Sequence, residues 1–394
     1  MREKGNNAME KKMTRTIKSG KRVEILKTLY ANGVLPYKSL KLYNGETGLT
    51  QRKVKEMERD GEIVRYGTGK DSVITLKNGW KEGTQHWKDK AFIARREALQ
   101  EELYKCLSEG GTRLNRFSKR AELNLMMHLA GVGAYPDEKP DMNDISYKGL
   151  DAFYYNADEV KDATCYLDDV KEEDGKKQTS VSRLSGLEIS QGGIYATYSL
   201  GNKLIEWNRF GEVRMKEIIK RTIGEKNQKI VETNPIDCII FADDYKLFER
   251  VILNELEAHP AYNTKILLNI DFAYEHMYAL PTDKNGIALL EEMKKKDWLK
   301  DMRHILLGDH NIPPMGTQVV CDAVEDDKYI LMFTSCDISR LKSFIKRARM
   351  TEDAEKFVVY CFSFQTPLIK RLAGDYVTIG EIELGDYKEE VRKL

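Results

Sequence analysis

Residues 50–77, TQRKVKEMERDGEIVRYGTGKDSVITLK, decide the fold predicted for the N-terminal region, because a helical pattern is followed at once by a hairpin pattern. Thr50 is a residue type preferred at helix N-caps, and the residues after it predict a helix that ends at Gly61. At about 100° per residue, Val54 and Met57 point to one side of this helix. Alternating residues on both sides of a glycine-rich turn then predict two short strands.

Two further helices are predicted before this stretch. KRVEILKTLYANG, residues 21–33, places its apolar residues along one helical stripe and ends at a glycine. Pro36 is expected to open a short second helix, because proline at the first helical position loses no hydrogen bond. Leu49 and Val54 have the spacing of a hydrophobic staple at the start of the third helix. Three short helices and a hairpin with a basic tip match the winged helix-turn-helix plan.

The charge of the chain is unevenly distributed, although the formal net charge is only +1. Residues 1–120 contain 28 Lys and Arg against 15 Asp and Glu, whereas the rest of the chain contains 36 against 48. A basic module and an acidic module in one chain indicate two different partners. The basic module is expected to bind a polyanion, and nucleic acid is the first candidate.

The third helix, the hairpin and the basic N-terminal arm are expected to contact DNA. Arg52, Lys55 and Arg59 point away from the apolar side of the helix, so they can reach guanine edges or phosphates in the major groove. Glu56 lies on the same side and is expected to pair with Arg52 and Arg59. The expected contact residues are Thr50, Gln51, Arg52, Lys53, Lys55 and Arg59 on the helix, Arg65 and Lys70 in the hairpin, and Arg15, Lys18 and Lys21 in the arm. A module that binds protein through this face is the alternative.

Beyond residue 150, strands alternate with helices, which predicts an α/β domain around a mixed sheet. The fold class is therefore α+β or α/β. Within this part the pattern predicts a strand over 203–207, a helix over 210–224 with Val213 facing inward, and one helix over 287–302. The predicted domains are a basic arm (1–20), a winged helix (21–80), a helical connector (81–150) and an α/β domain for dimerisation or partner binding (151–394), with the Pro- and Asp-rich 135–144 as a linker. Arg113, Arg116, Lys119 and Arg120 form a cluster that either extends the DNA contact or is a solvated helix face.

Three stretches of the sequence, FYYNADEVK, SVSRLSGLEIS and GGIYATYSLGNKLIEWNRFGEVRMKEII, carry a family resemblance. With the N-terminal region from about residue 10 they resemble the replication-relaxation proteins of Gram-positive mobile genetic elements. The resemblance extends to about residue 225 and is most specific at Ser182-Arg183, Gly186, Tyr195, Tyr198, Trp207 and Glu212. It implies a winged helix joined to an α/β domain, and a role in maintaining or transferring a mobile element.

A Mg²⁺-dependent nuclease with a restriction-endonuclease-like C-terminal domain is the main alternative. Such an enzyme needs acidic residues to hold the metal and a lysine close by. The acidic candidates are Glu212, Asp243, Asp244, Asp271 and Glu275, but no Asp/Glu-x-Lys follows an acidic strand. Asp243 and Asp244 also stand where they would cap a helix. No P-loop and no His-x-His cluster is present in the sequence, so no catalytic residue is assigned.

Six scattered cysteines without a Cys-x-x-Cys pair indicate a reduced chain with no structural zinc, and no metal or cofactor is expected. No apolar run reaches the roughly 18–20 residues of a membrane helix. The basic N-terminus lacks the apolar core of a secretory signal, so a cytoplasmic protein is expected.

The predicted function is sequence-specific binding of double-stranded DNA in the replication, transfer or transcriptional control of a mobile element. A homodimer is expected, since paired half-sites raise the effective affinity of a single winged helix. A replication or transfer protein is the expected partner of the acidic domain.

Overall fold

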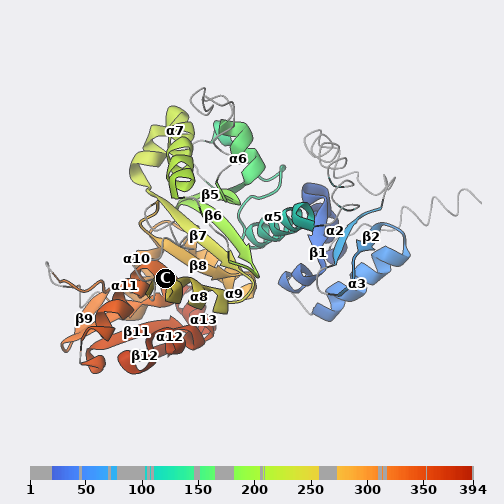
Figure 1. Ribbon diagram of the computed structural model, residues 1–394. Helices are drawn as coiled ribbons and strands as arrows, with labels where there is room; N and C mark the ends of the chain where they lie inside the picture. The colour runs from blue at the N-terminus through green and yellow to red at the C-terminus, as the bar shows by residue number, and fades with distance from the viewer. Residues whose placement is uncertain are drawn as a thin grey trace, which may run out of the picture. The chain divides into compact units, whose positions relative to one another are not determined.

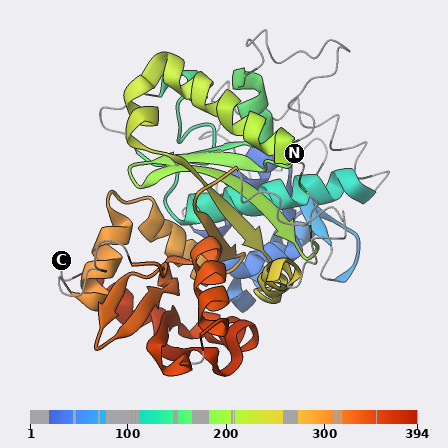
Figure 2. The same cartoon turned by 60° about the vertical axis from the view of Figure 1, so that its left-hand side comes forward.

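The computed structural model describes most of the chain and divides it into two compact units (Figures 1 and 2). The described residues are 20–43, 47–69, 72–77, 103, 107, 111–145, 151–164, 182–204, 207, 209–256, 273–308, 313, 317–351 and 353–392. Unit 1 comprises Met1–Leu129 and Ala134–Lys139, and unit 2 comprises Ala130–Gly133 and Pro140–Leu394. The predicted connector 81–150 is thus divided between the units. In the described part of the chain, no helix has the length and apolarity that a bilayer span requires.

Unit 1 combines helices with a small antiparallel sheet. The sheet has the order β1-β3-β2, so the central strand is the last of the three in sequence. The elements are α2 (Lys21–Asn32), β1 (Val34–Pro36), the 3-10 helix η1 (Tyr37–Leu42), α3 (Thr47–Arg59), β2 (Ile63–Tyr66), β3 (Val73–Leu76) and α5 (Gly111–Leu129). Strands β2 and β3 form the predicted hairpin.

The start of unit 1 follows the predicted pattern, with two corrections. Helix α2 ends at Gly33, whose φ of 75° suits glycine and whose amide donates to the Leu29 carbonyl at 2.8 Å. Pro36 does not open a helix; it is the last residue of β1 and pairs with Val73. The second helix begins after Pro36 and is a 3-10 helix rather than an α-helix.

Buried polar side chains hold α2 in unit 1. The Thr28 hydroxyl lies 2.8 Å from both the Tyr43 and the Tyr135 hydroxyl. A second group centres on Glu138, which accepts hydrogen bonds from Lys27 at 2.5 Å and lies 2.9 Å from His128 Nδ1. These contacts tie the 134–139 segment to α2 and α5. The Thr28 group is buried and the Glu138 group is partly buried, so a lost partner costs more here than at the surface.

Unit 2 contains a mixed five-stranded sheet with the order β4-β5-β6-β7-β8. Strand β5 is antiparallel to both of its neighbours, whereas β6, β7 and β8 are parallel. The strands are β4 (Phe153–Asn156), β5 (Gly186–Ser190), β6 (Gly193–Gly201), β7 (Ile236–Ala242) and β8 (Met277–Pro281). The helices that accompany them are α6 (Ala157–Thr164), α7 (Arg209–Thr233) and α8 (Lys246–Leu256). The predicted α+β class with a mixed sheet is confirmed.

A second sheet of four strands follows in unit 2, with the order β12-β11-β10-β9. Its strands are β9 (Ala323–Glu325), β10 (Lys328–Met332), β11 (Phe357–Phe362) and β12 (Thr378–Ile382). The helices of this part are α9 (Lys284–Met293), α10 (Trp298–Leu307), α11 (Ile338–Arg349), α12 (Thr366–Ala373) and α13 (Leu384–Val391), and short 3-10 turns connect several of them. Strand β8 also bonds to the segment between β10 and α11, where the Ala279 amide donates to the Cys336 carbonyl at 2.8 Å.

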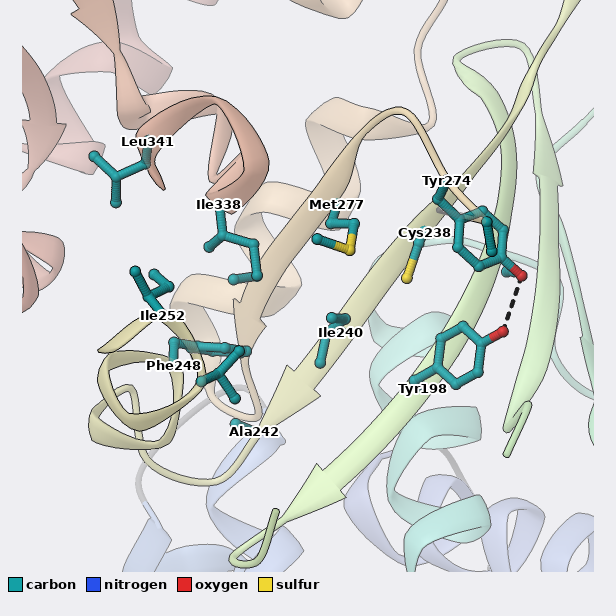
Figure 3. Close-up of a cluster of buried hydrophobic side chains, with 14 of the residues drawn as sticks. Tyr198, Cys238, Ile240, Ala242, Phe248, Ile252, Tyr274, Met277, Ile338 and Leu341 are labelled. Carbon is teal, nitrogen blue, oxygen red and sulfur yellow. Dashed lines mark hydrogen bonds between the residues drawn. The ribbon is translucent and has the colours of Figure 1, made fainter. Parts of the chain in front are cut away.

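One face of the five-stranded sheet forms the hydrophobic core of unit 2. Figure 3 shows Ile240 and Ala242 of β7 beside Phe248 of α8 and Ile338 of α11. Tyr198 lies at the edge of this cluster, with its hydroxyl 2.9 Å from that of Tyr274 (Figure 3). The same core includes residues of both sheets, so unit 2 is a single packed body.

Three predicted features of unit 2 differ in the structure. The predicted helix 287–302 is two helices, because Asp297 adopts a left-handed φ of 56° between α9 and α10. The described residues of 203–207 are not in a strand. Val213 is exposed rather than inward-facing, while the core side of α7 is formed by other residues.

The Glu138 carboxylate should make the free energy of unfolding of unit 1 depend on pH under acidic conditions. Burial raises the pKa of Glu138, but hydrogen bonds from His128 and Lys27 outweigh it and lower the pKa to about 2. A carboxyl group whose pKa falls on folding stabilises above its unfolded value of about 4.5, and this stability is lost as the pH falls toward 2. Glu138→Gln should therefore lower the free energy of unfolding at pH 7 by roughly 2–3 kcal/mol.

Urea denaturation of both proteins at pH 7 and pH 2.5 measures this effect. The stability difference between them should shrink at the lower pH. A difference that stays constant with pH would contradict the role assigned to the carboxylate.

Candidate nucleic-acid interface

Helix α3 has one buried side and one strongly basic exposed side. Val54 and Met57 are fully buried, as the helical period predicted. Arg52, Lys55 and Arg59 lie on the exposed side. The Arg59 side chain is 77% exposed. The predicted division of the helix into a packed face and a basic face is therefore present.

Most cations of this face have no strong internal partner. Neither Arg52 nor Lys55 makes a hydrogen bond or ion pair within the described residues. The Arg59 guanidinium lies 3.6 Å from Asp60, at the surface, where such a pair contributes little. The predicted pairing of Glu56 with Arg52 and Arg59 is replaced by a contact to Lys53 at 2.5 Å. The Lys53 hydrogen bond lowers the pKa of Glu56, so one carboxylate and one lysine neutralise each other at the margin of the face.

Thr50 is a correction to the expected contact set. Helix α3 begins at Thr47, so Thr50 lies in its first turn and is not its N-cap. The Thr50 side chain is buried, and its hydroxyl has no hydrogen-bond partner. It therefore cannot reach DNA from this position. Gln51 is half-buried.

Leu49 lies on the exposed side of α3, whereas the hydrophobic-staple prediction had placed it in the interior. It is 52% exposed, while its expected partner Val54 is buried. Leu49 stands one turn before Arg52, and Gly48 beside it has open space where a Cβ would be. The sequence rule failed here because the true helix start lies about one turn earlier, which rotates Leu49 outward.

Arg65 is held in place at the hairpin. Its Nε donates to the Ser72 hydroxyl at 2.9 Å, and its guanidinium lies 3.8 Å from the centre of the Tyr37 ring. The side chain is nevertheless exposed, so a fixed positive charge stands on β2. Lys70, the second contact residue expected in the hairpin, lies outside the described residues.

Of the three contact residues expected in the basic arm, Lys21 alone lies in the described part of the chain. Arg15 and Lys18 lie outside the described residues. Lys21 contacts Glu24 at 3.2 Å and stands over the Tyr43 ring, so part of its charge is used within unit 1. On α5, Arg116 is exposed, whereas the Arg120 guanidinium lies 4.4 Å from the Phe117 ring centre.

The comparisons with known proteins give no match: no family model, curated protein or solved structure is similar to this chain.

The acidic residues considered for a nuclease site have structural contacts. Glu212 accepts hydrogen bonds from the Ser182 and Tyr198 hydroxyls, each at 2.7 Å. Asp243 accepts from the Thr282 hydroxyl at 2.9 Å, and Asp244 caps the start of α8 through the Lys246 amide. Asp271 lies outside the described residues, and Glu275 is exposed. Across the described part of the chain, no three His, Cys, Asp or Glu side chains are grouped so that they could hold a metal ion.

A row of polar side chains crosses the second face of the five-stranded sheet, and no sequence motif indicated it. The strand register aligns Tyr154, Glu188, Tyr195 and Asp237 on neighbouring strands. The Tyr195 hydroxyl accepts from the Trp298 indole at 3.0 Å, which places α10 against this face. The row is thus covered by protein rather than open to solvent.

Glu188 is the unusual member of this row. Its side chain is fully buried, and neither carboxyl oxygen has a hydrogen-bond partner. Burial raises the pKa of Glu188 to about 8, with only small opposing effects from Ser190 and Lys294. Burial also raises the pKa of Asp237 to about 6. Glu188 is consequently protonated at neutral pH.

The buried carboxyl group of Glu188 predicts that unit 2 loses stability as the pH rises. A carboxyl group whose pKa is raised on folding contributes most below its unfolded value of about 4.5, and this contribution is lost as the pH rises through about 8. Glu188→Gln, which cannot ionise, should raise the free energy of unfolding at pH 8 by roughly 2–4 kcal/mol and change it little at pH 4.5.

Urea denaturation at several pH values between 4.5 and 8 measures this difference. Glu389→Gln, at an exposed glutamate of α13, is the matched control and should show no such trend. If the stability of Glu188→Gln has the same pH dependence as the wild type, Glu188 is not the group responsible for it.

Proposed function

We propose that unit 1 is a winged-helix module that binds double-stranded DNA, with α3 as the recognition helix in the major groove. The observation that carries the proposal is the exposed side of α3, where Arg52, Lys55 and Arg59 stand in line. Two of these three cations have no internal partner in the described residues. A positive stripe one helix wide fits the major groove, and phosphates on both sides of the groove attract it.

The order of elements supports the winged-helix interpretation. Helix α2, strand β1, the short helix η1, helix α3 and the β2–β3 hairpin follow one another as that plan requires. In such a module the N-terminal part of the recognition helix meets the base edges. Arg52 would donate two hydrogen bonds to a guanine, and the exposed Leu49 would contact a thymine methyl group. Arg65 would hold the phosphate backbone beside the groove.

The wider role follows from the family resemblance of the sequence and remains part of the proposal. A winged helix joined to an α/β unit would act in the replication, transfer or transcriptional control of a mobile element. Unit 2 would then recruit a replication or transfer protein in the cytoplasm. The nuclease alternative is not favoured by any described contact.

Removing the recognition-helix arginines should weaken DNA binding without unfolding the protein. Arg52→Ala should cost about 1–3 kcal/mol with the preferred site, or about 5- to 150-fold in Kd, and should reduce the preference for that site. Arg59→Ala should weaken all duplexes similarly and lower the salt slope by about 1. Fluorescence anisotropy with duplexes selected from a random library, over a salt series, measures both effects.

Arg250→Ala is the matched control, because Arg250 is an exposed arginine of α8 in unit 2. It removes the same charge and should leave the affinity unchanged. If wild-type protein binds no duplex at low salt, the protein-binding alternative is favoured. If both α3 variants bind as well as Arg250→Ala, DNA is bound elsewhere and α3 is not the recognition helix.

A further inference from the structure

Helix α11 and the residue after it carry positive charges and no negative charge. Neither aspartate nor glutamate occurs from Ile338 to Met350. The cations of this stretch are Arg340, Lys342, Lys346, Arg347 and Arg349. Residues 121–394, which include α11, hold more acidic than basic residues, so the helix differs in sign from the part of the chain around it. A helix of uniform positive charge indicates a surface for a polyanion.

The apolar side of α11 is already used within unit 2. Ile338, Leu341 and Ile345 are buried in its hydrophobic core. At about 100° per residue, Lys346 and Met350 point away from that core, and Met350 is 69% exposed. The surface that α11 presents to solvent is therefore its basic side.

Lys346 and Arg347 are available to an external anion. Both side chains are exposed, and neither makes a hydrogen bond or ion pair within the described residues. Arg349 differs, because its guanidinium donates to the Leu372 carbonyl at 2.6 Å. That contact holds the end of α11 beside the end of α12.

Like charges lie one turn apart on this helix. Burial lowers the pKa of the half-buried Lys342, and the positive charge of Lys346 lowers it further. Like charges at this spacing destabilise a helix. The helix dipole favours the cations of the last turn, but Lys342 lies in the middle of α11, where the dipole has little effect. A bound anion would relieve the repulsion.

An exposed aromatic ring lies next to this basic side. The 3-10 turn η10 (Gly374–Tyr376) adjoins α11. Tyr376 is 47% exposed. Asp375 beside it is also exposed, and its negative charge repels a phosphate. The ring therefore offers an uncharged, planar surface close to two available cations.

We propose that α11 and Tyr376 bind single-stranded nucleic acid, with phosphates on Lys346 and Arg347 and an unpaired base stacked on the Tyr376 ring. Cations that follow the backbone, combined with an exposed aromatic ring, are the usual means of binding single strands without sequence preference. Asp375 favours a base over a phosphate at the ring. This surface belongs to unit 2 and does not rest on the proposal that α3 binds duplex DNA.

A single strand suits this surface better than other polyanions. A membrane surface is bound through an exposed apolar helix side, whereas the apolar side of α11 lies in the core. Duplex DNA has no unpaired base to place on Tyr376. An acidic protein segment would match the cations but has no planar base for the ring.

Fluorescence anisotropy of the full chain over a salt series tests the proposal, with a labelled single strand of about 20 nucleotides and a duplex of the same length. The Lys346→Gln/Arg347→Gln double variant should bind the single strand about tenfold more weakly. The slope of its affinity against salt should fall by about 1.4, since two phosphate contacts are lost. Tyr376→Ser should weaken single-strand binding by about 5- to 150-fold and leave that slope unchanged.

Two controls separate this surface from general electrostatics and from α3. The Lys161→Gln/Lys220→Gln double variant removes two exposed lysines from α6 and α7 and should bind the single strand like the wild type. Duplex binding should be unchanged in the α11 and Tyr376 variants. Circular dichroism confirms that each variant is folded.

Photochemical cross-linking locates the stacked base. A single strand containing 5-iodouracil should cross-link to Tyr376, as mass spectrometry of the digested protein can show. The cross-link should disappear in Tyr376→Ser. A strand held elsewhere on the chain would cross-link to other residues and leave Tyr376 unmodified.

The proposal is overturned if the wild type binds no single strand at low salt, or if the α11 and control variants lose affinity equally. Equal weakening of duplex binding in the α11 variant would show that the surface does not select single strands. Equally tight binding to anionic lipid vesicles, or displacement of the strand by polyglutamate at equal charge, would favour a different partner. Failure here leaves the α3 proposal intact, because that proposal is measured on duplexes with the α3 variants.

Discussion

The buried carboxylate of Glu212 fixes how α7 lies on the five-stranded sheet. It accepts hydrogen bonds from the Ser182 hydroxyl, the Arg183 amide and the Tyr198 hydroxyl, each at 2.7 Å. A buried carboxylate needs such donors, because burial without them costs several kcal/mol. With Glu212 turned inward in the first turn, residues about 100° and 200° away around the helix must point elsewhere. Phe210 and Val213 are those residues, so one polar contact determines which apolar side chains face solvent.

Burial raises the pKa of both Glu212 and Glu188, but Glu188, on strand β5, lacks the hydrogen-bond donors that surround Glu212. Strand periodicity places it on the polar face, but no donor reaches its oxygens, and burial keeps the group protonated. Both glutamates are buried, and the sequence around them does not distinguish them. The difference comes from tertiary partners: the 182–184 segment and β6 supply donors to Glu212, and nothing comparable reaches Glu188.

Periodicity predicted the elements of this fold better than it predicted their ends. The two-residue alternation located β5 and β6, and the helical period placed Val54 and Met57 in the core of unit 1. The start of α3 was wrong by about a turn, because Thr47 and Thr50 are equally good helix-start residues by type. This error placed Thr50 at the surface and Leu49 in the core, the reverse of what is found. Val213 was also misplaced, since its orientation depends on the Glu212 contacts, which the sequence does not show.

The exposed sides of α3 and α7 differ in the signs of the charges that they carry. The exposed Leu49 and the exposed Phe210 add nothing to the packing of the folded chain. In the function proposed above, DNA covers Leu49 of α3, and the positive charges beside Leu49 are the reason for that choice of partner. On α3 the most exposed charges, Arg52, Lys55 and Arg59, are all positive. Such a surface attracts a polyanion and would repel a second copy of the same helix. On α7 the exposed charges have both signs: Arg214, Lys220 and Arg221 stand beside Glu217 and Glu225, so this helix presents no uniformly positive stripe to a polyanion. The near-zero net charge of the chain conceals this distinction; the order of charges along each helix reveals it.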